Sequence, residues 1–399
     1  MRIVIPNLHA NFMLLTTASV YIFKFSPAVK HNYLLRYLLD RPDVEVCTYL
    51  NNRSFSIFTK GPELLQKCLK KTLSRIEMRW IFKKNGISSR QVTMLSGPEQ
   101  VQDADIVLAY NICHDEYDML EKAKGIKALC MIHFGGNATE NSLIEKADIA
   151  CYYNEANLSQ TSAIFQKYYH VDRPWLIIPF VFAERFRNLK PFSARKNRAF
   201  SVGTITYKAN PEFLAVYGDP CDQPIRKIVK DNPGYFTDTV DCYSQDYLED
   251  DDVKSIKKSD NTLTKIYKRI HNRFNTGRQK KYFSFDMVEK FNEYKMHIVG
   301  EEILGVPGIG FVEGMACGSA YIGIDSPMYR DLGLVPGEHY IGYDGTKEGL
   351  RATIEYWQRP ENQEALERIA ATGCRFVREN FCGPKVAERL LESLIALRK

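Results

Sequence analysis

Strand-like and helix-like segments alternate along most of this 399-residue chain, and no other feature restricts its fold as strongly. The apolar run RIVIP is followed by the amphipathic stretch SPAVKHNYLLRYLLDRPD, in which Ser26 and Pro27 are placed to begin a helix, and then by the apolar run VEVCTYL. The runs ADIVLAYN, KALCMIHFGG and ADIACYYN continue the strand pattern, and EANLSQTSAIFQKYY, which follows the last of them, is expected to form a helix. Strands that alternate with helices form a parallel sheet covered on both faces. The sequence therefore predicts a doubly wound, Rossmann-like α/β domain over residues 1–183.

A second domain of the same kind is predicted after a stretch that contains three prolines and a basic run. Prolines interrupt regular structure, and we place a linker over residues 184–196. Strand and helix patterns resume at AFSVG and continue to the last helices. This predicts a second Rossmann-like domain over residues 197–382. The helix predicted in residues 383–399 is a candidate to cross back to the first domain.

Charge and cysteine usage narrow the class of protein. The net charge of +6 is small and the basic residues are spread along the chain, which favours a local anionic ligand over a nucleic-acid surface. The ten cysteines form no CxxC pair, which is typical of reduced thiols and predicts a cytoplasmic protein. The apolar run NFMLLTTASVYIF is shorter than a bilayer span, and membrane contact is expected to be peripheral at most. The acidic run at residues 249–252 favours a solvated surface over a metal site.

One glutamate stands in unusual surroundings. Glu313 lies among glycines and apolar residues in GIGFVEGMACGSAYIG, where a short helix is expected. A glutamate is almost never fully buried without a partner, so it either reaches a cleft or meets hydrogen-bond donors. A helix N-terminus attracts phosphate, and Gly308, Gly310 and Gly314 would let a ligand approach the backbone closely. The alternative is that Glu313 caps its own helix or pairs with a nearby cation.

The run KMHIVGEEILGVPGIGFVEGMACGSAYIGIDSPMYRDLGL and its continuation resemble the nucleotide-sugar glycosyltransferases of the GT-B fold, group 1 type. The close resemblance covers roughly residues 285–395. It implies two Rossmann-like domains that face a central cleft, the first binding the acceptor and the second the nucleotide sugar. It also implies that Glu313 binds the ribose hydroxyls of the donor while the helix points its amide end at the diphosphate. Two positions depart from the family: Gly305 stands where many members have a second glutamate, and Thr204 follows Gly203 where they have arginine.

Further site residues are proposed from their positions. Arg226, after a strand and ahead of a helix, and Lys295, at the start of KMHIVG, would neutralise the diphosphate, and His133 at a strand end is the candidate on the acceptor side, unless each is structural. Asp115 is a second possible base. The predicted donor-binding residues are Glu313, Gly310, Gly314, Gly203, Thr204 and Lys208.

The resemblance implies a hexosyl or pentosyl transferase that needs no metal and no cofactor. It favours retention of configuration, with a nucleotide-diphosphate sugar as donor and a hydroxyl of a glycan, lipid-linked or protein-linked acceptor. A non-catalytic sugar-nucleotide or glycan-binding protein on the same fold is the main alternative. An epimerase or phosphorylase and a nucleic-acid-binding protein are more distant alternatives.

Overall fold

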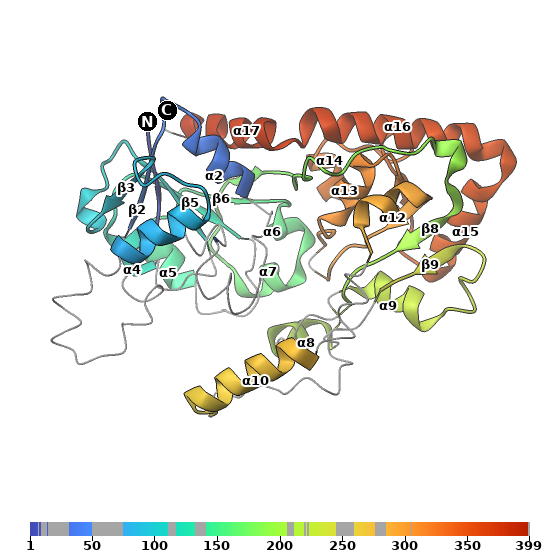
Figure 1. The fold of residues 1–399 in the computed structure, drawn as a ribbon, viewed down its shortest axis with the longest axis horizontal. Coiled ribbons are helices and arrows are strands. Elements are labelled where there is room, and N and C mark those ends of the chain that lie inside the picture. Colours follow the sequence, from blue (N-terminus) through green and yellow to red (C-terminus); the bar gives the residue numbers. More distant parts are fainter. Residues whose placement is uncertain are drawn as a thin grey trace. The chain divides into compact units, whose positions relative to one another are not determined.

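The computed structural model describes residues 1–6, 8, 14, 32–49, 75–110, 117–131, 141–205, 211–218, 221, 223–244, 259–275, 285–303 and 305–397. The chain divides into two compact units (Figure 1). Unit 1 contains residues 1–157, 165–181 and 383–399, and unit 2 contains residues 158–164 and 182–382. The stretch expected as a linker, residues 184–196, is part of unit 2 in this division.

Unit 1 is built on a seven-stranded sheet with the order β3-β2-β1-β4-β5-β6-β7, and its neighbouring strands are parallel. The strand order reverses between β1 and β4, as in a doubly wound sheet. The predicted α/β class is therefore confirmed for this half. Its strands are β1 (Arg2–Ile5), β2 (Glu45–Tyr49), β3 (Val92–Leu95), β4 (Ile106–Tyr110), β5 (Ile126–Cys130), β6 (Cys151–Asn154) and β7 (Trp175–Ile177). Its helices are α2 (Asn32–Leu39), a helix over 75–84, η3 (Pro98–Gln100), α4 (Tyr117–Lys122), α5 (Asn141–Lys146) and α17 (Gly383–Ala396), and α7 (Ala163–Tyr168) leads into it from unit 2.

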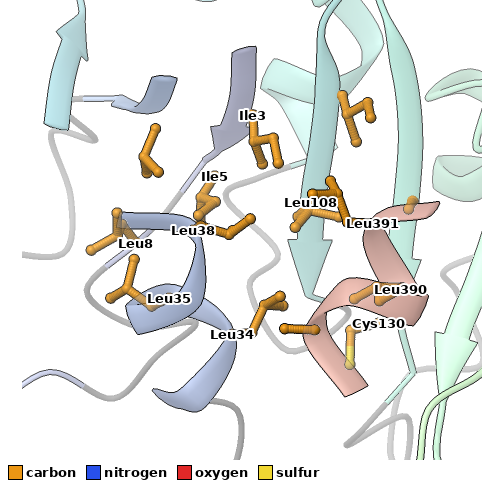
Figure 2. Packing of buried hydrophobic residues seen from close by; sticks show 14 of the residues in the cluster. Ile3, Ile5, Leu8, Leu34, Leu35, Leu38, Leu108, Cys130, Leu390 and Leu391 are labelled. Carbon is orange, nitrogen blue, oxygen red and sulfur yellow. The ribbon is translucent and has the colours of Figure 1, made fainter. Parts of the chain in front are cut away.

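The C-terminal helix α17 belongs to unit 1, as its predicted crossing back requires. Its residues Leu390 and Leu391 are buried in the same apolar cluster as Leu34 and Leu38 of α2 and Ile3 of β1 (Figure 2). Burial of a leucine side chain stabilises a fold by roughly 1.5–3 kcal/mol. A segment from the far end of the sequence therefore completes the core around the first strand.

Unit 2 is built on a five-stranded parallel sheet with the order β12-β11-β10-β8-β9. Counted along this unit, the order is 2-1-3-4-5, which places the reversal of strand order between β8 and β10. Its strands are β8 (Lys196–Ser201), β9 (Val240–Cys242), β10 (Tyr294–Ile298), β11 (Ala320–Ile324) and β12 (Ile341–Tyr343). Its helices are α6 (Leu158–Thr161), η6 (Phe192–Ala194), α8 (Pro211–Tyr217), α9 (Pro224–Asp231), α10 (Thr262–Asn275), α12 (Met287–Glu293), α13 (Gly310–Ala316), α14 (Pro327–Asp331), α15 (Lys347–Gln358), η7 (Pro360–Asn362) and α16 (Gln363–Asn380).

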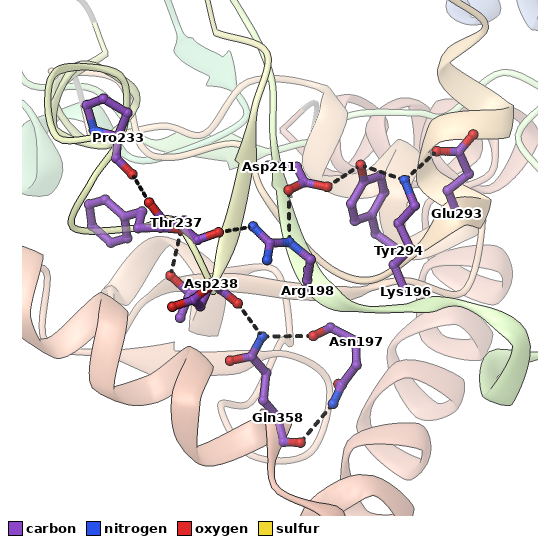
Figure 3. A network of polar contacts seen from close by, with 12 residues as sticks. Lys196, Asn197, Arg198, Pro233, Thr237, Asp238, Asp241, Glu293, Tyr294 and Gln358 are labelled. Atoms are coloured by element: carbon purple, nitrogen blue, oxygen red, sulfur yellow. Dashed lines mark hydrogen bonds and ion pairs between the residues drawn. The ribbon is translucent and has the colours of Figure 1, made fainter.

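A polar network ties strands β8, β9 and β10 to the end of α15 (Figure 3). The carboxylate of Asp241 accepts hydrogen bonds from Arg198 Nε at 2.8 Å and from the Tyr294 hydroxyl at 2.7 Å. Asn197 and Gln358 each donate a side-chain amide to the other's backbone carbonyl, at 2.7 and 2.8 Å. These bonds hold β8, β9, β10 and α15 together, so this part of the sheet has a structural role. Ligands of doubly wound sheets bind at the carboxyl edge.

One predicted helix is wrong. The run EANLSQTSAIFQKYY was expected to form a single helix, but the structure interrupts it at Ser162, between α6 and α7. The hydroxyl of Ser162 and the amides of Ala163 and Ile164 bond the phenol oxygen of Tyr217. A partner from α8 therefore satisfies the first amides of α7, which a continuous helix would have bonded internally.

The helices and the cysteines bear on the predictions about membrane contact and reduced thiols. No helix within the described ranges is long and apolar enough to cross a membrane. Six of the eight cysteines with a described environment are buried, and all eight are free thiols.

Candidate functional site

The carboxyl ends of β8 and β10, where the strand order of unit 2 reverses, are joined by one arginine. Arg226 donates from Nε to the carbonyl of Val299 at 2.5 Å and from Nη1 to the carbonyl of Thr204 at 2.8 Å. These carbonyls follow β10 and β8, so the guanidinium lies across the reversal point, where doubly wound sheets bind ligands. Arg226 was expected ahead of a helix, but it occupies the third position of α9, after Pro224 at the first.

Glycines surround the first turn of α9. A Cβ atom on Gly203 would lie 2.2 Å from Arg226 Nη1, and one on Gly308 would lie 3.0 Å from Nη2. Gly203 also has φ +137°, which a residue with a side chain rarely adopts. A side chain at residue 203 or 308 would therefore displace the Arg226 guanidinium from its position between β8 and β10. The structure thus brings together three predicted site residues, Gly203, Thr204 and Arg226.

Arg226 is buried without a counter-charge in the described part of the chain. The residue is 4% exposed, no described carboxylate lies within ion-pair distance, and Nη2 has no described hydrogen-bond partner. Burial of an unpaired charge is costly, so a positive group held in this way favours an anion.

Arg195 shows what a purely structural buried arginine looks like in the same unit. Its Nη2 group donates to Asn188 Oδ1 at 2.7 Å and to the carbonyl of Cys317 at 2.8 Å, and Nη1 donates to the carbonyl of Phe291 at 3.2 Å. Burial lowers its pKa. Because neutral oxygens of the protein already occupy both terminal nitrogens, Arg195 is not a candidate for ligand binding.

Glu313 lies in the first turn of α13, and its carboxylate has no hydrogen-bond or ion-pair partner among the described residues. It does not cap its helix, whose N-cap residue is Ile309. Burial raises its pKa to about 7, and the positive charge of Arg185 opposes that shift. Neither non-ligand role considered for this residue, a cap or an ion pair, occurs in the described structure. A half-buried carboxylate in this state favours an incoming donor of hydrogen bonds.

Glu301, a second glutamate near this edge, has protein partners at one of its two carboxylate oxygens. Its Oε1 atom accepts from the amide of Ile324 at 3.0 Å and from the hydroxyls of Tyr329 and Tyr321. Burial raises its pKa as well. These three bonds fix the segment that follows β10 to β11 and α14, so Glu301 has a structural role beside the site.

Two glycines of the predicted phosphate-binding turn pack against protein atoms. A Cβ on Gly310 would lie 3.2 Å from Val299, and one on Gly314 would lie 2.3 Å from His297 Nε2. His297 is fully buried in β10, and burial lowers its pKa to about 3. Gly314 was expected to give room to a ligand; in the structure the histidine ring takes that room. Gly318 ends α13 with φ +74°.

The remaining predicted residues are not brought to this edge or cannot be placed. Lys295 lies at the amino end of β10, donates to Gln363 Oε1 at 2.5 Å and stacks on Phe192, so the structure separates it from Arg226 by the length of the strand. His133, Asp115 and Lys208 lie outside the described residues.

Gln223, the N-cap residue of α9, is a neighbour of Arg226 that the sequence analysis did not single out. Its side chain is fully buried, and neither its amide nitrogen nor its oxygen has a hydrogen-bond partner among the residues that the structure describes. The signal was Pro224, because proline at the first helical position marks the start of α9. Within the described ranges no group of three or more His, Cys, Asp and Glu residues is arranged to hold a metal ion.

Sequence comparison finds no matching family model and no matching curated protein. Solved structures do match over the whole chain. A glycosyltransferase from Rickettsia africae matches with a TM-score of 0.51 at 11% identity, over 100% of this chain and 98% of its own. HepE from Anabaena in complex with UDP matches with a TM-score of 0.51 at 13% identity, over 99% and 100%. Pneumococcal GtfA gives a TM-score of 0.43, and 58% of its length is matched. The chain therefore has the GT-B fold of two Rossmann-like domains.

Proposed function

We propose that this chain is a glycosyltransferase that moves a sugar from a nucleoside-diphosphate sugar to a hydroxyl group of an acceptor. The observation that carries the proposal is the carboxylate of Glu313, half-buried and without a described partner at the carboxyl edge of unit 2. The fold agrees with it, since HepE, which shares that fold, was solved with UDP bound.

The two charged groups of this edge suit the two halves of such a donor. A ribose offers two adjacent hydroxyls, and a carboxylate can accept a hydrogen bond from each. A diphosphate carries the negative charge that the buried guanidinium of Arg226 lacks among its described neighbours. Binding would therefore remove an electrostatic cost that each group carries in the unliganded protein.

Transfer itself requires one bond to break and one to form. The bond between the anomeric carbon and the diphosphate oxygen breaks, its electron pair leaves with the phosphate, and the acceptor oxygen bonds the anomeric carbon. We infer retention of configuration, in which the departing phosphate takes the acceptor proton, with Arg226 stabilising the growing charge and no metal required. Inversion would instead need a base such as His133 or Asp115.

Calorimetric titration of a panel of nucleoside diphosphates tests the donor site. We expect one of them to bind the wild type, and Glu313→Gln to weaken its binding by about tenfold or more, because the amide accepts fewer hydrogen bonds than the carboxylate. Glu361→Gln, a change at an exposed glutamate of η7, is the matched control and should leave affinity unchanged. Equal affinity of wild type and Glu313→Gln would contradict the proposed role.

A non-catalytic nucleotide-sugar-binding protein is the second candidate, and Gly305 favours it. Gly305 has φ +76°, and a Cβ there would lie 2.8 Å from the carbonyl of Thr161, so this position cannot carry the glutamate common in the resembling family. Release of nucleoside diphosphate from labelled nucleotide sugars, with and without candidate acceptors, separates the two. A transferase releases it in an acceptor-dependent manner, whereas a binding protein binds the donor and releases none.

A further inference from the structure

The helix over residues 75–84 in unit 1 is anchored to the core by one of its faces. Met78, Ile81 and Phe82 are at most 1% exposed and belong to the apolar cluster around β1. At 3.6 residues per turn these three positions fall within an arc of about 100° around the helix. Because this face is packed in the core, it determines which residues of the helix face away from unit 1.

The outer face of this helix is both apolar and cationic. Ile76 and Trp80, which are neighbours at i and i+4, are 58% and 48% exposed. Arg75, Arg79 and Lys83 are exposed as well. The five positions fall within an arc of about 140° on the side away from the core. A surface helix usually turns a polar face to water, so a tryptophan beside an isoleucine on this side indicates a contact surface.

The cations of the outer face are free to bind a partner. Neither Arg79 nor Lys83 has a hydrogen-bond or ion-pair partner in the described part of the chain. Arg75 donates from one nitrogen to Ser96 Oγ at 3.5 Å. The acidic residue of this helix, Glu77, lies about 60° outside the exposed arc and is only partly exposed. The positive charge of the face therefore favours an anionic partner.

A bilayer with anionic headgroups suits this face better than other anionic or apolar partners do. Tryptophan is enriched where acyl chains meet headgroups, and long cationic side chains there extend toward the lipid phosphates. A second copy of this chain would bring like charges together. Two exposed apolar side chains are also few for a specific protein–protein interface, which buries about 800 Å² on each partner. A nucleic acid could stack on Trp80 and pair with the cations, but it would leave Ile76 without a contact.

We propose that the outer face of the helix over residues 75–84 docks unit 1 on an anionic membrane. Ile76 and Trp80 enter the boundary between headgroups and acyl chains, and Arg79 and Lys83 bind lipid phosphates. Apolar insertion and electrostatic attraction act together in contacts of this kind. The core face stays packed in unit 1 while the outer face is bound. This inference does not rest on the proposed transferase activity, because the proposed donor site lies in unit 2.

Co-sedimentation of the full chain with vesicles tests the role of the cations. Vesicles of phosphatidylcholine with about 30% phosphatidylglycerol should bind the wild type about tenfold or more tightly than pure phosphatidylcholine vesicles, and about 0.5 M salt should weaken that binding. The double variant Arg79→Gln, Lys83→Gln should lose about tenfold or more of this affinity. The double variant Lys122→Gln, Lys146→Gln is the matched control, because it removes the same charge from exposed lysines of α4 and α5. Its binding should stay within about twofold of the wild type.

Tryptophan fluorescence tests the role of the apolar pair. The emission of the wild type should shift to shorter wavelength when anionic vesicles are added, and Trp80→Phe should bind without that shift. The double variant Ile76→Ser, Trp80→Ser should bind anionic vesicles about tenfold or more weakly, because the inserted apolar surface is gone. The matched control is Leu189→Ser, Val335→Ser, at exposed aliphatic residues of unit 2, and it should bind as the wild type does.

Circular dichroism shows whether each variant retains the helical content of the wild type. The Arg79→Gln, Lys83→Gln variant changes only exposed side chains, so it still tests the proposal if the apolar variant unfolds. The proposal is overturned by equal binding of the wild type to neutral and anionic vesicles, or by a folded variant of either pair that binds as the wild type does. It is also overturned if the wild type binds single-stranded DNA through these cations and binds no vesicles. Calorimetric affinity for a nucleoside diphosphate should be the same in the wild type and both variants, which keeps this result separate from the donor site.

Discussion

Among the buried charged residues of unit 2, hydrogen-bond partners distinguish structural groups from candidate ligand-binding groups. Both terminal nitrogens of Arg195 and one carboxylate oxygen of Glu301 have protein partners. Arg226, in contrast, has no described carboxylate beside it, and Glu313 has no described hydrogen-bond donor. The free energy of burying such groups must come from elsewhere in the fold or be recovered when a ligand binds. The hydrogen-bond partners of a buried charged residue therefore indicate a ligand-binding site better than its residue type alone does.

Replacement of Glu313 by glutamine should make the protein more stable at pH 8. The pKa of about 7 lies above the ordinary value of 4.5, so between these values the folded chain holds a proton that the unfolded chain has released. Stability conferred by this proton is present at low pH and is lost as the pH rises through about 7. Glu313→Gln removes this loss of stability, which amounts to about 1–3 kcal/mol in the free energy of unfolding at pH 8. We therefore expect the variant's unit 2 to melt a few degrees above that of the wild type at pH 8, and at the same temperature near pH 4.5.

Glu361→Gln again serves as the control for that experiment, because residue 361 is exposed in η7. Differential scanning calorimetry at pH 4.5, 6 and 8 gives the three comparisons needed. A Glu313→Gln difference that does not change with pH would show that this carboxyl has the same pKa in the folded and in the unfolded chain, and would contradict the raised pKa.

At the residue scale the sequence predicted the site unevenly. Glu313 and Gly203 lie in short sequence patterns of glycines and apolar residues, so their place at the site could be predicted from the residues next to them in the chain. Arg226 was selected, but its contacts with the carbonyls of Thr204 and Val299 join segments 22 and 73 residues away, and no local pattern specifies them. Lys295 was predicted at the site because β10 faces the site at its carboxyl end. Lys295 lies at the amino end of this strand, however, and therefore at the opposite edge of the sheet.

At the scale of elements, the contact of α13 with β10 depends on a missing side chain. Gly314→Ala would place a Cβ atom 2.3 Å from the ring nitrogen of His297, which has buried neighbours on all sides. We expect this change to destabilise unit 2 by about 1–3 kcal/mol, because a packed core must shift to admit a methyl group. Thermal unfolding measures the effect, and a weaker affinity for nucleoside diphosphate should accompany it, since α13 carries Glu313.

Gly234→Ala is the matched control, because a Cβ atom at Gly234 would meet no atom within 4 Å. It should change stability by less than about 1 kcal/mol. The double variant Gly314→Ala, His297→Ala relieves the clash and should cost less than the sum of its single changes. Strict additivity of the two changes would contradict direct packing of the glycine on the histidine.

The elements themselves were largely predictable. Long apolar runs and amphipathic stretches gave β1, β10, β11 and the last three helices, because a buried strand and a helix with one apolar face have distinct periodicities. The three-residue strands β7 and β9 are too short to show a period. The interruption at Ser162 depends on Tyr217, 55 residues later, and the outward orientation of the apolar face of α10 is equally invisible to periodicity, which gives a face but not its direction.

At the scale of the whole molecule, the core of unit 1 depends on α17. Leu390 is 1% exposed and packs in the cluster that contains Ile3 and Leu108 (Figure 2). We expect Leu390→Ala to destabilise unit 1 by about 2–5 kcal/mol through the cavity that it leaves. Hydrogen exchange should show faster exchange of the β1 and β4 amides and unchanged exchange of those of β10 and β11.

Leu397→Ala is the control, because Leu397 follows α17 and is 36% exposed. Exchange in both units should remain that of the wild type in this variant. Equal acceleration of exchange in the two units after Leu390→Ala would indicate that they unfold as one body, contrary to the division described above.

The late position of α17 in the chain has a consequence for biosynthesis. About 200 residues separate the last strand of unit 1 from the helix that completes its core. A ribosome adds roughly 5–20 residues per second, so the nascent first half must wait on the order of 10–40 seconds for its missing leucines. Throughout that interval an apolar gap beside β1 is open to chaperones or to other nascent chains, and the half that is synthesised first is the last to reach its native state.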